Sequence, residues 1–281
     1  MISQTTSVFT TRILAALLMV SLLLCACAPA VQPLARVESA APADTAAPLV
    51  VTAAPVVTFA APDSGLPAVS LDTGSLASGY QAEIIPAAFG GDMPYWEVLP
   101  EYTRVTLQGY PISDHLHEPV VYIYPLNGLK KVNQGAGTVA DALESLLGSP
   151  REIADMPFLP LFNAGQMMHT HLQYLDFQSG QGLRYLTMFS QGIVPINNHE
   201  LIYTYQSLTS DGKYYVAAVL PVTHASLPAD GSVTGSEPPE FMSDYAAYVA
   251  NTAASLNTQA ANTFTPELTQ LDAMMSSLEV K

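Results

Sequence analysis

The chain has 281 residues and a formal net charge of −15, with 24 acidic and 9 basic side chains. Such an acidic surface repels nucleic acids and anionic lipid headgroups, which argues against binding either of them through charge. The two cysteines, Cys25 and Cys27, both lie close to the N-terminus. We therefore expect a folded part without disulfides, which depends on burial alone.

The first element in chain order is an apolar run over residues 13–24, preceded by Arg12. A membrane-spanning helix needs about 20 apolar residues, whereas the core of a signal peptide needs only about 7–15. The Ala- and Pro-rich sequence that follows cannot extend the run. We therefore predict that residues 1–26 are a signal peptide for export.

The segment Leu24-Cys25-Ala26-Cys27 ends this run. It resembles the lipobox of bacterial lipoproteins, with leucine three places before the lipidated cysteine and a small residue just before it. The resemblance implies cleavage before Cys27 and anchoring by its acyl chains in the lipid bilayer, at the extracytoplasmic face of the cell membrane. Cleavage before Cys25 would put Leu24 where the peptidase requires a small side chain. An ordinary secretory signal, cleaved at an Ala-x-Ala-like site, is the other alternative.

The next segment is rich in Ala, Pro, Val, Thr and Ser and shows no helical or alternating period. Such a composition is typical of an extended, disordered linker. All 14 tyrosines lie at Tyr80 or later, and the single tryptophan is Trp96. We therefore predict a lipidated tether over residues 27–91, disordered and protease-sensitive from residue 28 to about residue 80, followed by one domain over residues 92–281.

Strand patterns dominate the first two thirds of this domain. Polar and apolar residues alternate over 103–110, and 120–124 is an apolar run typical of a buried strand. Four more strands are predicted at 167–177, 183–191, 201–208 and 213–221. Glycines in the segments that join them, Gly180 with Gly182 and then Gly212, are expected to supply the positive φ of tight hairpins.

Helical patterns lie between and after the strands. Residues 138–147 carry an apolar face and end at Gly148 and Pro150. A second apolar stripe runs from Phe241 to Leu256, and Thr265 is predicted to cap a last helix with Pro266 at its first position. Strands in the middle and helices towards the end favour an α+β fold, in which helices cover an antiparallel meander. The pattern leaves the strand order open.

Two segments are similar to the closing hairpin and last helix of PsbP-like domains. They are Tyr203-Thr204-Tyr205-Gln206 through Tyr214-Tyr215-Val216-Ala217, and Phe264-Thr265-Pro266-Glu267-Leu268 through residues 271–278. The resemblance covers about a third of the chain. It implies an extrinsic binding module with an antiparallel sheet between helices. The predicted tether and the paired histidines depart from that family.

Four of the six histidines form two His-x-His pairs, His115 with His117 and His169 with His171. On a strand, residues i and i+2 point to the same side, so each pair offers two imidazoles to a zinc ion. Asp114, Glu118 or His199 would complete four ligands. The alternative is that these histidines are solvated or hydrogen-bonded, as polar residues on the wet side of a strand commonly are.

Other chemical motifs are weak. Leu71-Asp72-Thr73-Gly74 has the letters of an aspartic-protease strand, but Asp72 and Asp63 are neighbours in the predicted tether and read as turn residues. No Gly-x-Ser-x-Gly elbow and no phosphate-binding glycine loop is present. We therefore interpret the chain as a non-catalytic module that binds an unknown protein or small molecule, or that has a structural role in the envelope. The alternatives are a zinc-binding lipoprotein and a hydrolase with carboxylate chemistry.

Overall fold

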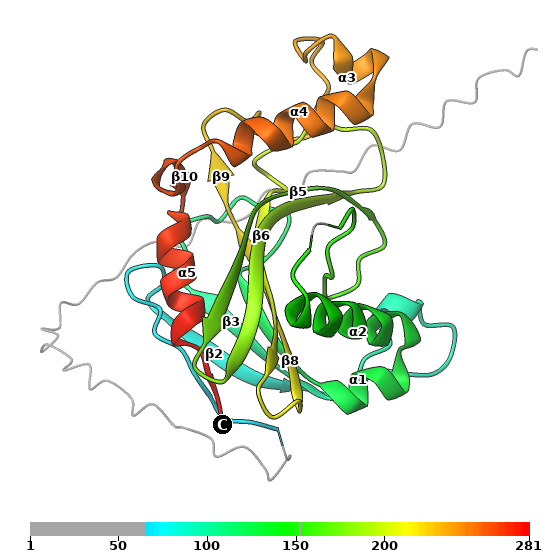
Figure 1. The fold of residues 1–281 in the computed structure, drawn as a ribbon, viewed down its shortest axis with the longest axis vertical. Coiled ribbons are helices and arrows are strands. Elements are labelled where there is room, and N and C mark those ends of the chain that lie inside the picture. Colours follow the sequence, from blue (N-terminus) through cyan, green and yellow to red (C-terminus); the bar gives the residue numbers. More distant parts are fainter. Residues whose placement is uncertain (1–65, 152) are drawn as a thin grey trace, which may run out of the picture. The chain divides into compact units, whose positions relative to one another are not determined.

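The computed structural model describes residues 66–151 and 153–281; residues 1–65, with the predicted signal peptide, Cys27 and most of the tether, lie outside this range. One seven-stranded antiparallel sheet forms the centre of the fold (Figure 1). Its strands are β2 (Gly79–Ile85), β3 (Tyr102–Gln108), β4 (Val120–Pro125), β5 (Gly165–Phe177), β6 (Gly180–Ser190), β7 (Ile202–Thr209) and β8 (Tyr214–Pro221). Two short pairs join β1 (Val69–Ser70) to β11 (Glu279–Val280), and β9 (Thr223–His224) to β10 (Phe264–Thr265).

The strand order is β2-β3-β4-β8-β7-β6-β5. The sheet therefore consists of two meanders, β2 to β4 and β5 to β8, which join where β4 pairs with β8. The central strands β7 and β8 are buried on both faces; β8 is a continuous apolar run, whereas β7 also buries the polar side chains of Thr204, Gln206 and Ser207. Because the second meander folds back onto β4, its first strand, β5, becomes an edge of the sheet.

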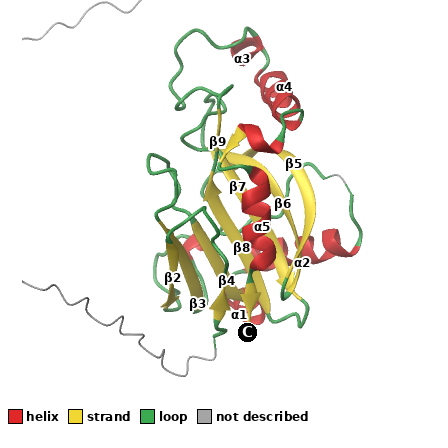
Figure 2. Ribbon diagram, turned by 90° about the vertical axis from the view of Figure 1, so that its left-hand side faces the viewer, coloured by secondary structure: helices red, strands yellow, loops and turns green. Residues whose placement is uncertain are grey.

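Helices cover both faces of the sheet, so the predicted α+β class is confirmed (Figure 2). The helices are α1 (Leu126–Val132), α2 (Gln134–Gly148), α3 (Glu240–Ser243), α4 (Tyr245–Asn257) and α5 (Leu268–Ser277). Apolar side chains of α1 and α2 pack on one face, and those of α3, α4 and α5 pack on the other. None of the helices in the described part of the chain is long and apolar enough to cross a membrane.

The predicted start of the domain at residue 92 is too late. Strand β2 pairs with β3 at seven positions, from Gly79 opposite Gln108 to Ile85 opposite Tyr102. Leu71 and Leu76, which precede β2, are buried in the core. These elements have weak local signals, because β2 is a half-exposed edge strand whose polar and apolar residues do not alternate regularly. Asp72 accepts a hydrogen bond from the N–H of Gly74 (2.9 Å), which is the predicted turn role.

Two details of the predicted elements also change. Gly212 has a positive φ of 67°, as expected, but Gly180 and Gly182 do not. A side chain on either would collide with β7, because a Cβ would lie 2.1 Å from the carbonyl of Leu208 or 2.4 Å from the Cβ of Ser207. Thr265 does not cap the last helix; it belongs to β10, and the N-cap of α5 is Glu267.

A carboxamide fixes the connection between α2 and β5 to one face of the sheet. The side chain of Gln206 is fully buried on β7. Its Oε1 accepts the N–H of Leu159 and its Nε2 donates to the carbonyl of the same residue, both at 3.0 Å. The hydroxyl of Tyr215 donates to the same Oε1 (2.6 Å). The carboxamide of Gln206 thus satisfies the backbone N–H and C=O of Leu159, as a neighbouring strand would. Without it, the buried loop would leave these groups without hydrogen-bond partners.

An ion pair fixes α5 to the opposite face. Arg184 on β6 donates to both carboxylate oxygens of Asp272 on α5, at 3.0 and 3.2 Å. The arginine side chain is 6% exposed and the aspartate side chain 15%. Tyr203 on β7 also donates to Asp272 (2.9 Å), and Arg184 donates further to Gln173 (2.8 Å). The pair therefore has the additional hydrogen bonds that a desolvated charge requires.

We expect Asp272→Asn to destabilise the domain, because it leaves the guanidinium of Arg184 buried without a counter-charge. Loss of one partner of such a pair costs about 3 kcal/mol, or roughly 6–12 °C in Tm for a domain of this size. The double variant Arg184→Met, Asp272→Leu should recover part of the loss, since it removes both charges. Thermal melting followed by circular dichroism measures the effect.

The control is Asp211→Asn, which breaks the solvent-exposed ion pair with Lys213. Its Tm should stay close to that of the wild type. An Asp272→Asn protein that melts together with this control would contradict the structural role of the buried pair.

Candidate functional site

Two bulges interrupt the edge strand β5. Its pairing with β6 shifts between Gln166 and Met168, and again between Thr170 and Gln173. At the second bulge, two residues, His171 and Leu172, stand opposite Tyr185 alone. His171 has a φ of +52°, and it is the only residue other than glycine in the described chain with a positive φ. Such a backbone is unfavourable for a side chain with a Cβ, and it persists only where the surroundings hold it.

Contacts on both sides hold this bulge. The N–H of His171 donates to Oδ1 of Asn257 at the end of α4 (2.9 Å), and Arg184 donates to the carbonyl of His171. The imidazole Nε2 donates to the carbonyl of Leu256 (2.7 Å). The hydroxyl of Thr170 lies 3.1 Å from the carbonyl of Ala253. The bulge is therefore the point at which α4 is attached to the sheet.

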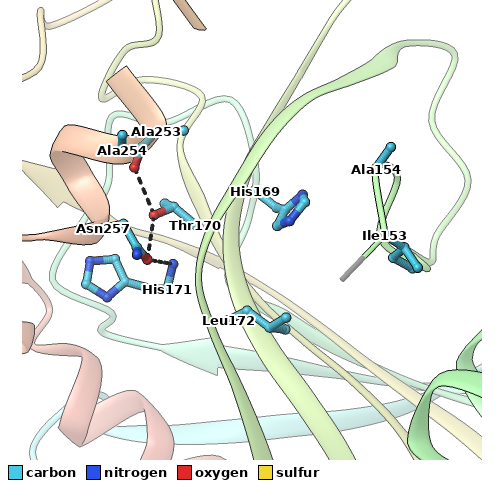
Figure 3. A pocket seen from close by; sticks show the side chains of 9 residues that line it. All are labelled: Ile153, Ala154, His169, Thr170, His171, Leu172, Ala253, Ala254 and Asn257. Carbon is cyan, nitrogen blue, oxygen red and sulfur yellow. Dashed lines mark hydrogen bonds between the residues drawn. The ribbon is translucent and has the colours of Figure 1, made fainter. Parts of the chain in front are cut away.

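The bulge also separates the second histidine pair. His169 lies against Tyr185, with ring centroids 6.5 Å apart, on the face that α2 covers. His171 packs edge-on against Phe264 at 5.0 Å, on the opposite face. Figure 3 shows the two imidazoles on opposite sides of the strand. The expectation that i and i+2 share a side is wrong here, because the extra residue shifts the alternation by one.

The first histidine pair lies in the loop before β4. The N–H of His117 donates to Nδ1 of His115 (3.0 Å), so the proton of His115 is on Nε2, which donates to the carbonyl of Leu201 (2.9 Å). The ring of His117 stacks on Phe162 at 5.0 Å and 9°. His199 lies beside His115, with ring centroids 6.1 Å apart. Both nitrogens of His115 therefore have hydrogen-bond partners, which makes this imidazole a poor metal ligand.

The predicted zinc site does not form from these residues. Within residues 66–151 and 153–281, no three His, Cys, Asp or Glu side chains are grouped so that they could hold a metal ion. Among the additional ligands considered, Glu118 pairs with Arg104. His115 and His117 remain in one cluster, whereas His169 and His171 point to opposite faces of β5. The alternative of hydrogen-bonded and packed histidines describes the observed geometry.

A trough lies along the outer edge of β5, between α4 and the residues that follow α2 (Figure 3). It consists of two adjoining cavities of about 560 and 480 Å³, which share Ala154, His169 and Ala253. We call it the β5 trough. The first cavity is lined by Ile153, Ala154, His169, Thr170, His171, Leu172, Ala253, Ala254 and Asn257. The second is lined by Ala154, Gln166, Met167, Met168, His169, Tyr245, Ala246, Val249, Ala250 and Ala253.

The lining of the β5 trough is mainly apolar in the second cavity and mixed polar and apolar in the first. None of the described residues that line it is Asp, Glu, Lys or Arg, in a chain whose net charge is −15. Its polar groups are hydroxyls, carboxamides and imidazoles. Burial lowers the pKa of His171, and the nearby Arg184 lowers it further, so its imidazole is neutral at pH 7. Concave apolar surfaces with a few polar groups are typical of ligand-binding sites.

Sequence reasoning missed this trough. It identified His169 and His171 as a pair, but it gave no role to Gln166 or to the alanines of α4. The available signal was the spacing of Ala246, Ala250 and Ala253, which places three small side chains along one side of a predicted helix. The position of β5 at the edge of the sheet could not be found this way, since it depends on the strand order.

Comparison of the chain with protein-family models, with curated proteins and with solved structures finds no match. The interpretation of the site therefore rests on its own geometry and chemistry. The resemblances of the sequence to bacterial lipoproteins and to PsbP-like domains stay predictions.

The histidine cluster predicts a pH dependence of stability. Burial, together with the neighbouring His115 and His199, lowers the pKa of His117 to about 4. Burial also lowers the pKa of His115. The unfolded chain takes up these protons near pH 6.5, before the folded chain does. The contribution of the cluster to stability is therefore complete above pH 6.5 and is lost as the pH falls towards 4.

We expect His117→Phe to reduce this acid-induced loss, because phenylalanine can keep the stacking on Phe162 and takes up no proton. Urea unfolding between pH 7.5 and 4.5 measures the free energy of unfolding for both proteins. Carboxylates titrate in both, so the difference between the two curves isolates His117. Parallel curves over this range would show that protonation of His117 does not destabilise the fold.

Proposed function

We propose that the protein is a non-catalytic binding module, held at the extracytoplasmic face of a membrane by lipid on Cys27, which binds an uncharged apolar ligand in the β5 trough. The observation that supports binding is the uncharged lining of the trough, next to a backbone bulge that α4 and Arg184 hold in place. Because the backbone at this site is already fixed, less conformational entropy is lost when a ligand binds. Acidic residues outnumber basic ones in the chain, yet none in its described part lines the trough, so this concave surface favours an uncharged ligand.

The anchor in this proposal is based on the segment Leu24-Cys25-Ala26-Cys27. Two or more acyl chains on one cysteine are sufficient for stable membrane attachment. Their role would be to hold the binding domain at the membrane through the intervening residues. A ligand that is itself membrane-bound or extracytoplasmic would then meet the trough at high local concentration.

We expect the mature N-terminal peptide to begin at Cys27 and to carry acyl chains, as detected by mass spectrometry. The variant Cys27→Ser should lose the modification and move from the membrane fraction to the soluble fraction. Cys25→Ser is the matched control, because it leaves Cys27 and Ala26 in place and should be processed normally. Unmodified Cys27 in the wild type, or normal anchoring of Cys27→Ser, would refute the assignment.

The binding role is tested with Nile red, a neutral apolar dye whose fluorescence rises when it leaves water. We expect saturable binding to the full chain, and loss of that binding in Ala250→Phe, whose added ring fills the trough. Asn251→Phe is the control, because Asn251 is exposed on the same helix and lines neither cavity. Equal binding by Ala250→Phe and Asn251→Phe would overturn the trough as the binding site.

A further inference from the structure

The backbone of β5 is open along the β5 trough. In an antiparallel sheet, every second residue of an edge strand directs its N–H and C=O away from the neighbouring strand. Over residues 165–170, β5 pairs with β6 on one side. No other backbone segment of the described chain forms a hydrogen bond with the backbone of these residues. The carbonyl of Met168 accepts the hydroxyl of Thr187 on β6 (2.6 Å), so the alternation leaves the N–H and C=O of His169 facing the trough, beside its apolar side chains.

The bulges set the limits of this open edge. Met167 forms the first bulge, and His171 begins the second. The N–H of His171 is already used by Asn257, so strand pairing ends there. Between the two bulges, Met168, His169 and Thr170 keep a regular register with β6. The regular edge is therefore short, about three residues.

The two edges of the sheet differ in how they are protected. On β2, the exposed side chain of Glu83 lies 3.8 Å from Arg104, and charges on an edge strand discourage the addition of another strand. Residues 165–170 of β5 contain no Asp, Glu, Lys or Arg. The apolar wall formed by Val249 and Ala250 stands beside them. The edge of β5 thus lacks the protection that β2 has.

The chemical groups that line the trough also distinguish between classes of ligand. An acyl chain brings no hydrogen-bonding groups, so it would leave the backbone groups of β5 without partners. A charged ligand would find no counter-charge in the lining. An extended peptide brings backbone donors and acceptors in the same alternating pattern as the edge, and it directs alternate side chains to one side. Its chemistry is therefore complementary to both parts of the trough.

We propose that the ligand is an extended, uncharged peptide segment of a partner protein, which adds a short strand outside β5 along Met168–Thr170 and inserts an apolar side chain between Met167 and Val249. This inference rests on the proposed function, since it names the class of ligand that the same trough binds. At the two ends of this stretch, Oδ1 of Asn257 accepts the N–H of His171 and Oε1 of Gln166 accepts the N–H of Met156, so the fold itself holds both carboxamides.

The test uses a blocked pentapeptide, Thr-Leu-Thr-Leu-Thr, titrated into the full chain by calorimetry. Two further peptides carry N-methyl groups on alternate amides, one on the odd set and one on the even set. Only one set faces β5 in an added strand. Methylation of that set should weaken binding about tenfold or more, since each lost hydrogen bond is worth about 1 kcal/mol. Methylation of the other set should have little effect, and Ala250→Phe, but not Asn251→Phe, should abolish binding of the parent peptide.

The outcomes separate this inference from the proposed function. If the two methylated peptides bind equally, whether both bind like the parent or both fail, strand addition is overturned. If Nile red binds in an Ala250-dependent way and the parent peptide does not bind, the peptide ligand is overturned and the proposed function stands. If neither dye nor peptide binds, both fail.

Discussion

The buried ion pair between Arg184 and Asp272 is the interaction on which the geometry of the site depends. Arg184 lies on β6, and its guanidinium donates to Asp272 on α5 and to Gln173 and the carbonyl of His171 on β5. Tyr203 of β7 donates to the same carboxylate, so the pair and its hydrogen-bond partners join four elements. Removing two charges from water is costly, and it is tolerated here because each charge has several hydrogen-bond partners. The main effect of the pair is therefore to fix the positions of these elements relative to one another, more than to stabilise the fold.

Arg184 also fixes the backbone at the surface, through its hydrogen bond to the bulge at His171. The carbonyl of this residue accepts from Arg184 and its N–H donates to Asn257, so the unusual backbone is held from the core on one side and from α4 on the other. The position of α4 relative to β5 follows from these contacts. The width of the β5 trough is thus set by hydrogen bonds to main-chain atoms, which are less adaptable than contacts between apolar side chains.

On the opposite face of the sheet, a neutral carboxamide, that of Gln206, also holds a loop through its backbone. Gln206 binds the N–H and the carbonyl of Leu159, which fixes the connection that leads to the trough wall at Ala154. Both walls are therefore attached to the sheet by buried polar side chains of the second meander. Such networks specify a single arrangement when they are fully satisfied, because any alternative leaves a buried polar group without a partner.

The sequence alone determined the elements whose signals are local. The strands from 103 to 221, the helix at α2 and the apolar stripes of α4 and α5 follow from periodicity, and so does the α+β class. Tertiary structure decided the features that depend on long-range pairing. Residues 69–85 have weak local signals, and they join the fold because β3 and β11 accept them as partners. The edge position of β5 follows from the pairing of β4 with β8, which no turn specifies. The His-x-His spacing predicted a shared face for His169 and His171. Contacts with Arg184 and Asn257, 13 and 86 residues away from His171, impose a bulge that local sequence does not encode.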